Sequence, residues 1–576
     1  MTAFVAAWVP PGSRLPTKLP CVLVNALVPA GEVVSASTEN LTVVFWDSSL
    51  WAGTSSVSDG QGRSVIVAGD PILELDNHTC SRGEALLSFL HNALDNPDEL
   101  CRAAEGTYAA ASWDITGRLV ASTDKLGVRP LYWAQVGDVF YLSTVYWALT
   151  RIEEIPATAD LRAAVETCTF GAPLANRTLT ASVQVLGAGE LIDLRGAIPV
   201  IRRYWDWTHI EPNRLPPCEL PDYISDAFRT AVQARLQGQD RVFAFLSGGL
   251  DSRLIVAALR GNGTAVCTMN FAPPGSQDLL FGRLAAEAAG TQHFEFTDGG
   301  TDFAQRRNLA FAAWSEVPEH ATLQTAQSRL VWSGDGGSVG LGHVYLTEAI
   351  VTTARTGDFL ATARAIQNHN RNHVSPRSFQ HAYRDLVQWP LEGIREDLVS
   401  RSGMEAGRNA HLYFMLNDQR RHLAQHYETL HEHRIDLVLP FFDGRFVQAV
   451  ISSPVNVFLL HRLYNQMVAK LPFGLGQIPW QAYPTHEPCP VPVTVNARRQ
   501  WQDGWYSAPE VRREGRRRIA RLLRDLTSND FPSEVLHRPT LMAAALAALA
   551  GTHRFSHLLR PIEPVCRALR CVGEPR

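Results

Sequence analysis

The stretch that decides the fold reads, from residue 242 to residue 260, VFAFLSGGLDSRLIVAALR. Its first five residues are apolar and predict a short buried strand, and the residues from Arg253 to Arg260 predict a helix. The two-glycine turn between them directs backbone N–H groups, two hydroxyls and a helix N-terminus towards one point, a geometry that binds phosphate oxygens. Asp251 is an acid within this turn, so a divalent cation between its carboxylate and the phosphates is expected. The turn therefore predicts a nucleotide site, and an ordinary glycine-rich strand-to-helix turn is the competing interpretation.

The sequence of this turn separates it from other phosphate loops. No Gly-Lys-Ser/Thr follows the glycines, so it is not the loop of kinases and GTPases. It resembles the SGGxDS loop of ATP pyrophosphatases, a group that includes asparagine synthetase, β-lactam synthetase, lasso-peptide cyclase, GMP synthetase and argininosuccinate synthetase. The resemblance implies that the nucleotide phosphates are bound by Ser247, Gly248, Gly249, Asp251 and Ser252.

The bulk composition predicts a cytoplasmic protein of more than one domain. A chain of 576 residues is too long for a single hydrophobic core. Its net charge of −4, from 53 basic and 57 acidic residues, implies no general attraction to nucleic acid or to an anionic membrane. The nine cysteines contain no C-x-x-C pair and predict reduced thiols. The N-terminus lacks a basic signal-peptide region, and no apolar run approaches the roughly 20 residues that span a bilayer.

Proline content and strand–helix alternation divide the chain. Four prolines within residues 211–221 predict a linker. Before it, residues 1–210 mix short β-like runs with helices and predict an α+β domain of stacked layers. After it, residues 222–490 begin with a βαβαβ rhythm that predicts a parallel sheet with helices on both faces. The chain becomes mostly helical beyond about residue 350, and residues 491–576 are predicted as a helical extension, with an arginine-rich helix at 511–524 that we interpret as a solvated face.

The N-terminal part carries a second recognisable pattern. It reads AAASWD at residues 109–114 and DKLGVRPLYW at residues 124–133. This pattern resembles the glutamine amidotransferase domain of asparagine synthetases, and GMP and argininosuccinate synthetases lack such a partner. The chain as a whole thus resembles the asparagine synthetase B-type family. The implied fold is an αββα (Ntn-hydrolase-like) sandwich followed by an α/β ATP-pyrophosphatase (HUP-like) parallel-sheet domain with a helical C-terminal part.

Three residues of the glutaminase pattern differ from the family. Thr2 stands where the family has its nucleophilic cysteine, and Ala68-Gly69 replaces an Asn-Gly pair. Arg82 stands near the family's aspartate for the amine of glutamine, and its charge would repel that ammonium. An N-terminal threonine activated by its own amine is the alternative nucleophile. We predict a degenerate glutaminase domain that serves as a scaffold.

The resemblance also assigns residues around the nucleotide. Thr268 and Met269 on the next strand would contact adenine, and Leu246 would line the same pocket. Asp278 falls at an acidic position of the family, and a helix cap is the competing interpretation. His293 falls at a family histidine, and a packed strand residue is the competing interpretation.

A second glycine loop reads WSGDGGSVGLGHVY at residues 332–345. It resembles the family's S-G-E-G-x-D-E-x-x-G-G-Y and implies that Ser333, Gly334 and Gly336 bind pyrophosphate. Ser338 replaces an aspartate that helps to hold magnesium, so Asp251 and Asp335 remain as the candidate metal ligands and as catalytic residues. Pyrophosphate binding by backbone donors alone and a purely structural glycine turn are the alternatives.

The family's catalytic lysine lies in a K-x-x-L-R context, and here the corresponding residues 461–466 read HRLYNQ. Arg462 or Lys470 could supply the cation that stabilises charge on pyrophosphate. A solvated lysine is the competing interpretation for Lys470.

The implied reaction uses ATP and Mg²⁺ to adenylate the carboxylate of a small molecule or peptide, releases pyrophosphate, and joins the acyl group to an amine acceptor, as in β-lactam synthetases and lasso-peptide cyclases. One alternative is an asparagine synthetase-type enzyme that uses ammonia and aspartate. Another is an ATP-binding pseudoenzyme or scaffold. A second copy of the chain or a biosynthetic protein are the candidate protein partners.

Overall fold

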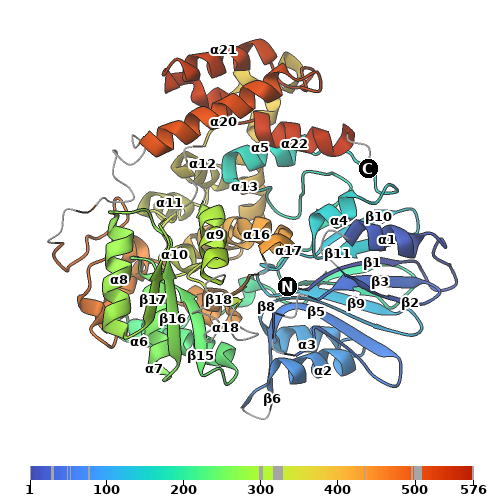
Figure 1. Cartoon of the computed structure of the whole chain (residues 1–576), viewed down its shortest axis with the longest axis horizontal. Helices are drawn as coiled ribbons and strands as arrows, with labels where there is room; N and C mark the ends of the chain where they lie inside the picture. The colour runs from blue at the N-terminus through green and yellow to red at the C-terminus, as the bar shows by residue number, and fades with distance from the viewer. Residues whose placement is uncertain are drawn as a thin grey trace.

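In the computed structural model, the chain folds into a layered β-sandwich, a parallel-sheet domain and a set of C-terminal helices (Figure 1). The structure describes residues 2–27, 32–47, 50–51, 53–75, 78–297, 303–315, 329–370, 372–433, 435–493, 497 and 509–573. Within these ranges, no helix has the length and apolar character needed to cross a membrane.

Two antiparallel sheets form the N-terminal part. Their strand orders are β12-β10-β11-β1-β3-β2 and β14-β13-β9-β8-β5-β4. The first sheet contains β1 (Ala3–Trp8), β2 (Val34–Ser37), β3 (Leu41–Trp46), β10 (Tyr132–Val136), β11 (Val139–Ser143) and β12 (Gln184–Val185). The second contains β4 (Ser56–Ser58), β5 (Arg63–Ile72), β8 (Glu105–Asp114), β9 (Leu119–Thr123), β13 (Glu190–Leu194) and β14 (Val200–Arg203).

Strand β1 shows how the sequence builds the layers, because successive side chains of a strand point to opposite faces. Phe4 and Trp8 pack between the two sheets. Val5 and Ala7 pack on the other face, against the helices that cover the first sheet. The predicted four-layer αββα order is confirmed. The covering helices are α1 (Leu19–Leu27) and α4 (Tyr146–Thr150) on the first sheet, and α2 (Arg82–Asn92) and α3 (Pro97–Ala103) on the second, with a hairpin of β6 (Glu74–Leu75) and β7 (His78–Thr79) before α2.

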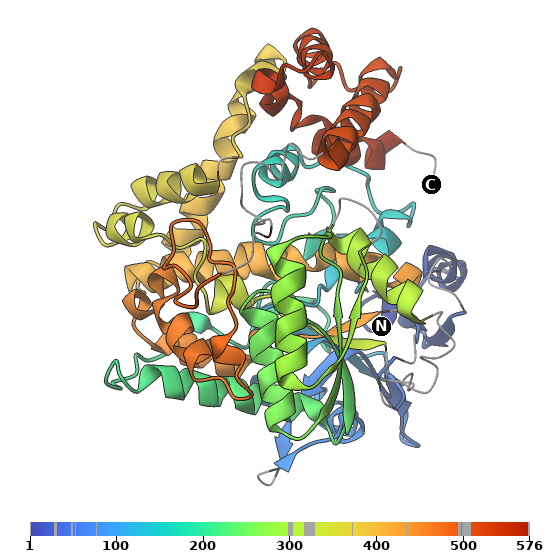
Figure 2. The ribbon, with the colours of Figure 1, turned by 60° about the vertical axis from the view of Figure 1, so that its left-hand side comes forward.

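The second domain is built on a five-stranded parallel sheet of order β17-β16-β15-β18-β19. This sheet confirms the βαβαβ prediction, and the green helices lie in front of the green strands in Figure 2. In addition, Phe311 and Trp314 pack on Phe243 of β15. The strands are β15 (Arg241–Phe245), β16 (Ala265–Asn270), β17 (Gln292–Glu295), β18 (Leu330–Trp332) and β19 (Asp436–Val438), and the helices are α6 (Leu220–Leu236), α7 (Asp251–Gly261), α8 (Gln277–Ala289) and α9 (Phe303–Ser315).

The predicted linker is only partly extended. Residues 211–216 have no regular structure, but helix α6 begins at Leu220, inside the proline-rich segment. Pro221 stands at the start of this helix, where its missing N–H costs no hydrogen bond.

The remaining chain is mostly helical, as the sequence predicts. The helices around the parallel sheet are α10 (Gly337–Gly340), α11 (Glu348–Ala354), α12 (Phe359–Asn370), α13 (Trp389–Ser400), α14 (Ala406–Tyr413), the π-helix η6 (Phe414–Gln419), α15 (Arg420–His422), α16 (Ala424–Glu428), α17 (Leu430–His433), α18 (Gly444–Ser452) and α19 (Arg462–Ala469). The C-terminal helices are α20 (Pro509–Thr527), α21 (Arg538–Leu549) and α22 (Ile562–Gly573).

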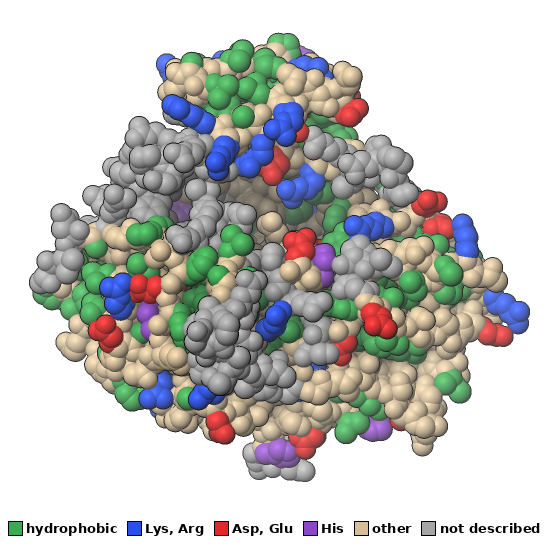
Figure 3. Space-filling model, in the orientation of Figure 1, with side chains coloured by type: hydrophobic (Ala, Val, Ile, Leu, Met, Phe, Trp, Pro, Cys, Tyr) green, Lys and Arg blue, Asp and Glu red, His purple; other side chains and the backbone are tan. Residues whose placement is uncertain are grey.

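The C-terminal helices form a core of their own on helix α5 (Leu161–Phe170) of the N-terminal part. Ala164 and Val165 of α5 share this core with Ile562 and Val565 of α22. The arginine-rich stretch lies on α20, and Lys and Arg side chains gather over the C-terminal helices in Figure 3. The described arginines from Arg516 to Arg518 are exposed, in agreement with a solvated face.

Candidate active site

The glycine turn after β15 is held by its own hydroxyl groups. The Ser247 backbone N–H donates to Ser252 Oγ over 3.0 Å, and the two hydroxyls lie 3.0 Å apart. The Gly249 N–H donates to Ser247 Oγ over 3.2 Å. Helix α7 begins immediately afterwards at Asp251. The turn thus brings together two hydroxyls, backbone amides and a helix N-terminus, as the sequence predicts.

Gly248 lies against the start of helix α8. Its N–H donates to Asp278 Oδ1 over 2.7 Å. A side chain at this position would place its Cβ 2.8 Å from the Cα of Asp278, so only glycine fits. Asp278 is not the cap of α8, because Ser276 Oγ accepts the capping hydrogen bond from the Leu279 N–H. An amide of the loop therefore already faces an anionic oxygen.

The Asp251 carboxylate occupies the centre of the site. Tyr464 Oη donates to its Oδ1 over 2.5 Å, and Ser338 Oγ donates to its Oδ2 over 2.8 Å. Burial raises the pKa of Asp251 to about 6, against the lowering effect of these two hydroxyls. Tyr464 is a site residue that the sequence analysis did not find, although it lies within the HRLYNQ stretch that was searched for a cation.

The second glycine loop packs directly on the first. A Cβ on Gly334 would lie 2.9 Å from the Cβ of Asp251, and one on Gly337 would lie 2.5 Å from its Cγ. Gly336 has φ +90°, which favours glycine. The structure therefore brings the predicted pyrophosphate residues Ser333, Gly334 and Gly336 to the same place as the SGGLDS turn.

Asp335, the second predicted metal ligand, has several partners of its own. Ser333 Oγ donates to its Oδ2 over 2.5 Å, and His422 Nε2 lies 3.2 Å from its Oδ1. Arg307 Nη1 lies 3.9 Å from its Oδ2. Burial alone would raise the pKa of Asp335, but His422, Arg307 and Ser333 outweigh it and hold this pKa well below its usual range.

The two carboxylates differ in how well they fit a magnesium ion. The named partners of Asp251 are neutral hydroxyls, so this buried carboxylate has an uncompensated charge whenever it is ionised. The charge of Asp335 is already compensated by Arg307 and His422. Carboxylate oxygens suit magnesium, and Asp251 is the residue whose surroundings fit it better.

The predicted adenine side is formed by the edges of β15 and β16. The Leu246 N–H donates to the Met269 carbonyl over 2.8 Å, which joins these two residues. The hydroxyl of Thr268 lies 2.9 Å from Nδ1 of His293 on β17. His293 therefore has a structural partner in the sheet, as its packing interpretation predicts.

The structure does not bring the two predicted cations to Asp251. Arg462 is half exposed and pairs with Glu348 and Glu487, each over 3.3 Å. Lys470 is exposed and pairs with Asp222 of α6 over 2.6 Å. The solvated interpretation of Lys470 agrees with this placement. These side chains point to other acids because helix α19 presents Tyr464, rather than Arg462, to the buried carboxylate.

A buried arginine that the sequence analysis missed follows the turn directly. Arg253 is fully buried and donates to the carbonyls of Ile478 over 2.6 Å and Pro479 over 2.9 Å. Burial lowers the pKa of this guanidinium to about 10. Its position next to SGGLDS was visible in the sequence, but its partners lie more than 200 residues away.

Thr2 and Arg82, which stand at or near functional positions of the glutaminase family, form hydrogen bonds within the protein. The hydroxyl of Thr2 donates to Asp47 Oδ1 over 3.3 Å. Arg82 is buried and donates to the carbonyls of Gly69 over 3.2 Å and Thr54 over 2.8 Å. Burial lowers the pKa of Arg82, while the charges of nearby carboxylates, Asp70 first, oppose this effect.

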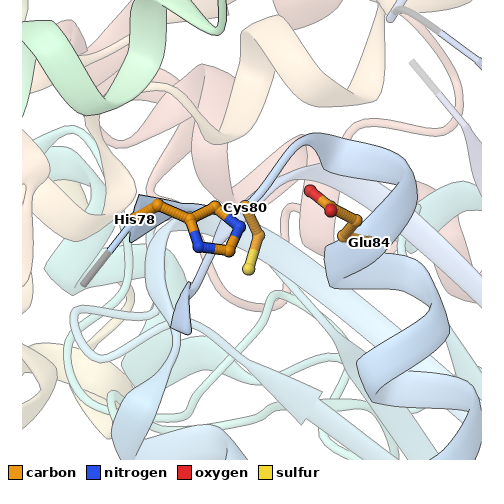
Figure 4. Close-up of side chains that lie close together, drawn as sticks. All are labelled: His78, Cys80 and Glu84. Atoms are coloured by element: carbon orange, nitrogen blue, oxygen red, sulfur yellow. The ribbon is translucent and has the colours of Figure 1, made fainter. Parts of the chain in front are cut away.

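His78, Cys80 and Glu84 lie close together beside β7 and the start of α2 (Figure 4), with ligand atoms within 4.8 Å of one another. Oε2 of Glu84 accepts from the Ser81 N–H over 2.8 Å and from the Ser81 hydroxyl over 2.9 Å. The Glu84 N–H in turn donates to Ser81 Oγ over 3.3 Å, which completes a capping box for α2, so this carboxylate has a structural role at the helix end.

Comparison with known proteins agrees with this architecture. Residues 223–466 match the asparagine synthase family model, and residues 74–205 match the glutamine amidotransferase domain model. A putative asparagine synthetase (glutamine-hydrolyzing) of Mycobacterium tuberculosis is 28% identical over 221 residues, 37% of this chain and 33% of that protein. Asparagine synthetase (glutamine-hydrolyzing) 3 of Bacillus subtilis is 24% identical over 192 residues, 33% of this chain and 31% of that protein. The matched region thus spans about a third of the length of each relative.

A solved structure of glutamine phosphoribosylpyrophosphate amidotransferase from B. subtilis, complexed with ADP and GMP, aligns with 53% of this chain and 94% of its own, at 10% identity and a TM-score of 0.25.

The fold and the paired glycine loops define a synthetase-type domain joined to a glutamine amidotransferase-type sandwich. The asparagine synthase match covers most of the parallel-sheet domain and its surrounding helices, and the glutamine amidotransferase match covers much of the sandwich.

Proposed function

We propose that this protein is an ATP-dependent carbon–nitrogen ligase that adenylates the carboxylate of a small molecule or peptide, releases pyrophosphate, and transfers the acyl group to an amine other than ammonia. The observation that carries the proposal is the contact of the two glycine loops at Asp251. A loop with backbone donors on one side and a buried acid on the other suits a triphosphate bound with a metal ion.

Each residue of the site has a role in this proposal. The hydroxyls of Ser247 and Ser252 and the loop amides would bind the phosphate oxygens. The Gly248 N–H would then give up its hydrogen bond to Asp278 and donate to a phosphate oxygen instead. Asp251 would hold the magnesium ion, with Tyr464 and Ser338 fixing its orientation. Magnesium, when bound, supplies charge neutralisation for the phosphates. Ser333, Gly334 and Gly336 would bind the departing pyrophosphate.

We also propose that the N-terminal half does not hydrolyse glutamine. Arg82 places a buried guanidinium beside Gly69, where a glutamine ammonium would be repelled. Thr2 donates to Asp47 and would have to give up this bond to act as a nucleophile. We retain the boundaries 1–210, 211–221, 222–490 and 491–576 as proposed domain limits, and a cytoplasmic location as part of the proposal.

Two other functions remain as alternatives with specific support. Arg462 and Lys470 pair with other acids, so neither supplies the catalytic cation at the glycine loops. This arrangement favours an ATP-binding scaffold. The family match favours an enzyme of the asparagine synthetase type that uses ammonia and aspartate.

Exchange of labelled pyrophosphate into ATP distinguishes these functions. We expect exchange that depends on magnesium and on a carboxylate substrate, and no release of glutamate from glutamine. ATP binding without exchange for any carboxylate would support the scaffold. Exchange with aspartate alone, followed by asparagine formation from ammonium, would support the asparagine synthetase alternative. Release of glutamate would overturn the proposal for the N-terminal half.

A further inference from the structure

A cavity of about 300 Å³ lies where the N-terminal part meets the helices around the second glycine loop. Its wall comes from segments far apart in the sequence. Helix α5 contributes Phe170, the end of the second loop contributes Tyr345, and α12 contributes His369. Helix α14 and the π-helix η6 contribute Tyr413 and Phe414.

The rings around this cavity are inclined to one another. The centroids of Tyr413 and Phe414 lie 5.3 Å apart at 72°, and those of Tyr345 and Phe414 lie 5.9 Å apart at 55°. Tyr345 and His369 lie 6.4 Å apart at 54°. The rings give this wall an aromatic surface on which an apolar body can pack.

The same wall carries one carboxylate. Asp418 lies on η6, and its Oδ2 accepts from the Gln419 amide over 2.5 Å. Among the described residues, no Lys or Arg lines the cavity, so Asp418 sets the sign of its charge. Burial raises the pKa of Asp418, so a cation placed beside it would stabilise the ionised form.

The π-helical turn brings these groups to one side. Tyr413 and Phe414 precede Asn417 and Asp418 by four residues, and all four line the cavity. Single π-helical turns of this kind are frequent at functional sites because they reposition side chains within a helix.

Electrostatic effects also link groups of the cavity to groups of the glycine loops. The positive charge of His422 acts on Asp418, and His422 in turn bonds Asp335 of the second loop. On the other side, Tyr483 lies near enough to both Tyr345 and Asp251 for each to raise its pKa, in addition to the larger effect of burial. Because Tyr345 ends the second glycine loop and also lines the cavity, the cavity lies next to that loop rather than on a remote surface.

We propose that this cavity binds the amine-bearing substrate of the synthetase, and that it selects an organic ammonium group carried on an aromatic or bulky aliphatic body. The rings of Tyr345, Tyr413 and Phe414 would contact the apolar body and the cation, and Asp418 would pair with the ammonium group. This inference rests on the proposed amide-forming function of the neighbouring loops.

The same chemistry disfavours the smaller candidates. An ammonium ion would leave most of a 300 Å³ cavity unfilled. Aspartate would bring two carboxylates beside Asp418, and like charges at short distance repel one another. The cavity thus points to an amine with an apolar body rather than to ammonia and aspartate.

The test uses phenethylammonium as the probe, titrated into the full-length protein by calorimetry. We expect millimolar or tighter binding, at least tenfold weaker binding of the neutral analogue 2-phenylethanol, and no binding of aspartate. Asp418→Asn should weaken phenethylammonium binding about tenfold, and Tyr345→Leu should weaken both ligands. Asp138→Asn, at an exposed turn between β10 and β11, is the matched control and should change neither.

Binding of magnesium–ATP, measured on the same samples, distinguishes a failure of the cavity inference from a failure of the proposed function. If magnesium–ATP binds but phenethylammonium does not, or if Asp418→Asn leaves its affinity unchanged, the cavity inference is wrong and the proposed function stands. If phenethylammonium binds as expected but magnesium–ATP does not, the proposed function is wrong while the cation-binding cavity remains.

Discussion

Arg129 and Asp436 form a fully buried ion pair between the two domains, with Nη2 of the arginine 2.7 Å from Oδ1 of the aspartate. Arg129 follows strand β9 of the sandwich, and Asp436 opens strand β19 of the parallel sheet. Trp51 Nε1 donates to the second oxygen of Asp436 over 2.9 Å. Burial alone would raise the pKa of Asp436, but the charge of Arg129 outweighs it and holds this pKa well below its usual range. The pair therefore joins the domains through charges that have no access to water.

Replacing one partner of this pair should destabilise the whole protein. Arg129→Met leaves the carboxylate of Asp436 buried without its cation, which typically costs about 3–5 kcal/mol. Unfolding in urea should show this loss. Arg14→Ala, at the exposed pair with Glu39, is the control and should change stability by less than about 1 kcal/mol. An equal effect of the two substitutions would contradict the structural role assigned to Arg129.

Removing the Tyr464 hydroxyl should weaken metal–nucleotide binding without unfolding the protein. Tyr464→Phe deletes the 2.5 Å hydrogen bond to Asp251, so the pKa of that carboxylate rises and less of it is ionised. We expect magnesium–ATP affinity to fall about tenfold, which corresponds to about 1.4 kcal/mol. Titration calorimetry measures this change, with the exposed Tyr223→Phe as the control. Unchanged affinity in Tyr464→Phe would show that the hydroxyl does not position Asp251.

Adding a single methyl group at Gly337 should push the two glycine loops apart. In Gly337→Ala the new Cβ would lie 2.5 Å from Cγ and Oδ1 of Asp251, so the carboxylate or the second loop must move. We expect loss of most pyrophosphate exchange, measured with ATP and the cognate carboxylate.

The matched control for this change is Gly261→Ala, at the end of the helix that begins with Asp251. An added Cβ there meets nothing within 4 Å. This variant should keep full activity and equal or greater stability, because alanine favours a helix more than glycine does. Equal activity of the two alanine variants would mean that the loops are not in contact.

Acid should destabilise the protein through a stack of buried histidines behind the second loop. His343 lies between His411, at 3.8 Å between ring centroids, and Phe458, at 4.6 Å. Burial lowers the pKa of His411 to about 4 and holds that of His343 well below its usual value. The folded state therefore favours neutral rings, and the unfolded state binds more protons below pH 6.5.

Stability should be complete above pH 6.5 and fall as the pH drops towards 4, by at most about 1.4 kcal/mol per pH unit for each such histidine. Urea unfolding at pH 7.5, 6 and 5 measures the slope. His411→Phe should flatten it, whereas the exposed His209→Gln should not. A slope that His411→Phe leaves unchanged would place the responsible groups elsewhere.

Local pattern predicted the fold well because the decisive signals lie within short stretches. The run from Val242 to Arg260 predicts strand β15, the glycine turn and helix α7 within two residues of their observed bounds. The alternation in Phe4–Trp8 and the apolar strands after it likewise predict the sandwich, since each element carries its own hydrophobic face.

The contacts within the site were harder to predict because they join distant segments. Tyr464 and Asp251 are 213 residues apart, and Ser338 and Asp251 are 87 apart. No local spacing indicates which residue of HRLYNQ faces inward, so the sequence favoured the charged Arg462 over Tyr464. The helix cap was a competing interpretation of Asp278 because its actual partner, the Gly248 N–H, lies 30 residues away in the sequence.

Helix α5 has one end in the aromatic cavity, through Phe170, and its flank against α22 in the C-terminal core. Helix α22 thus supports one wall of the cavity through its packing on α5. Substitutions in α22 can therefore widen or narrow the aromatic cavity while every residue that lines it stays the same. Substrate specificity can thus change through residues that do not face the substrate.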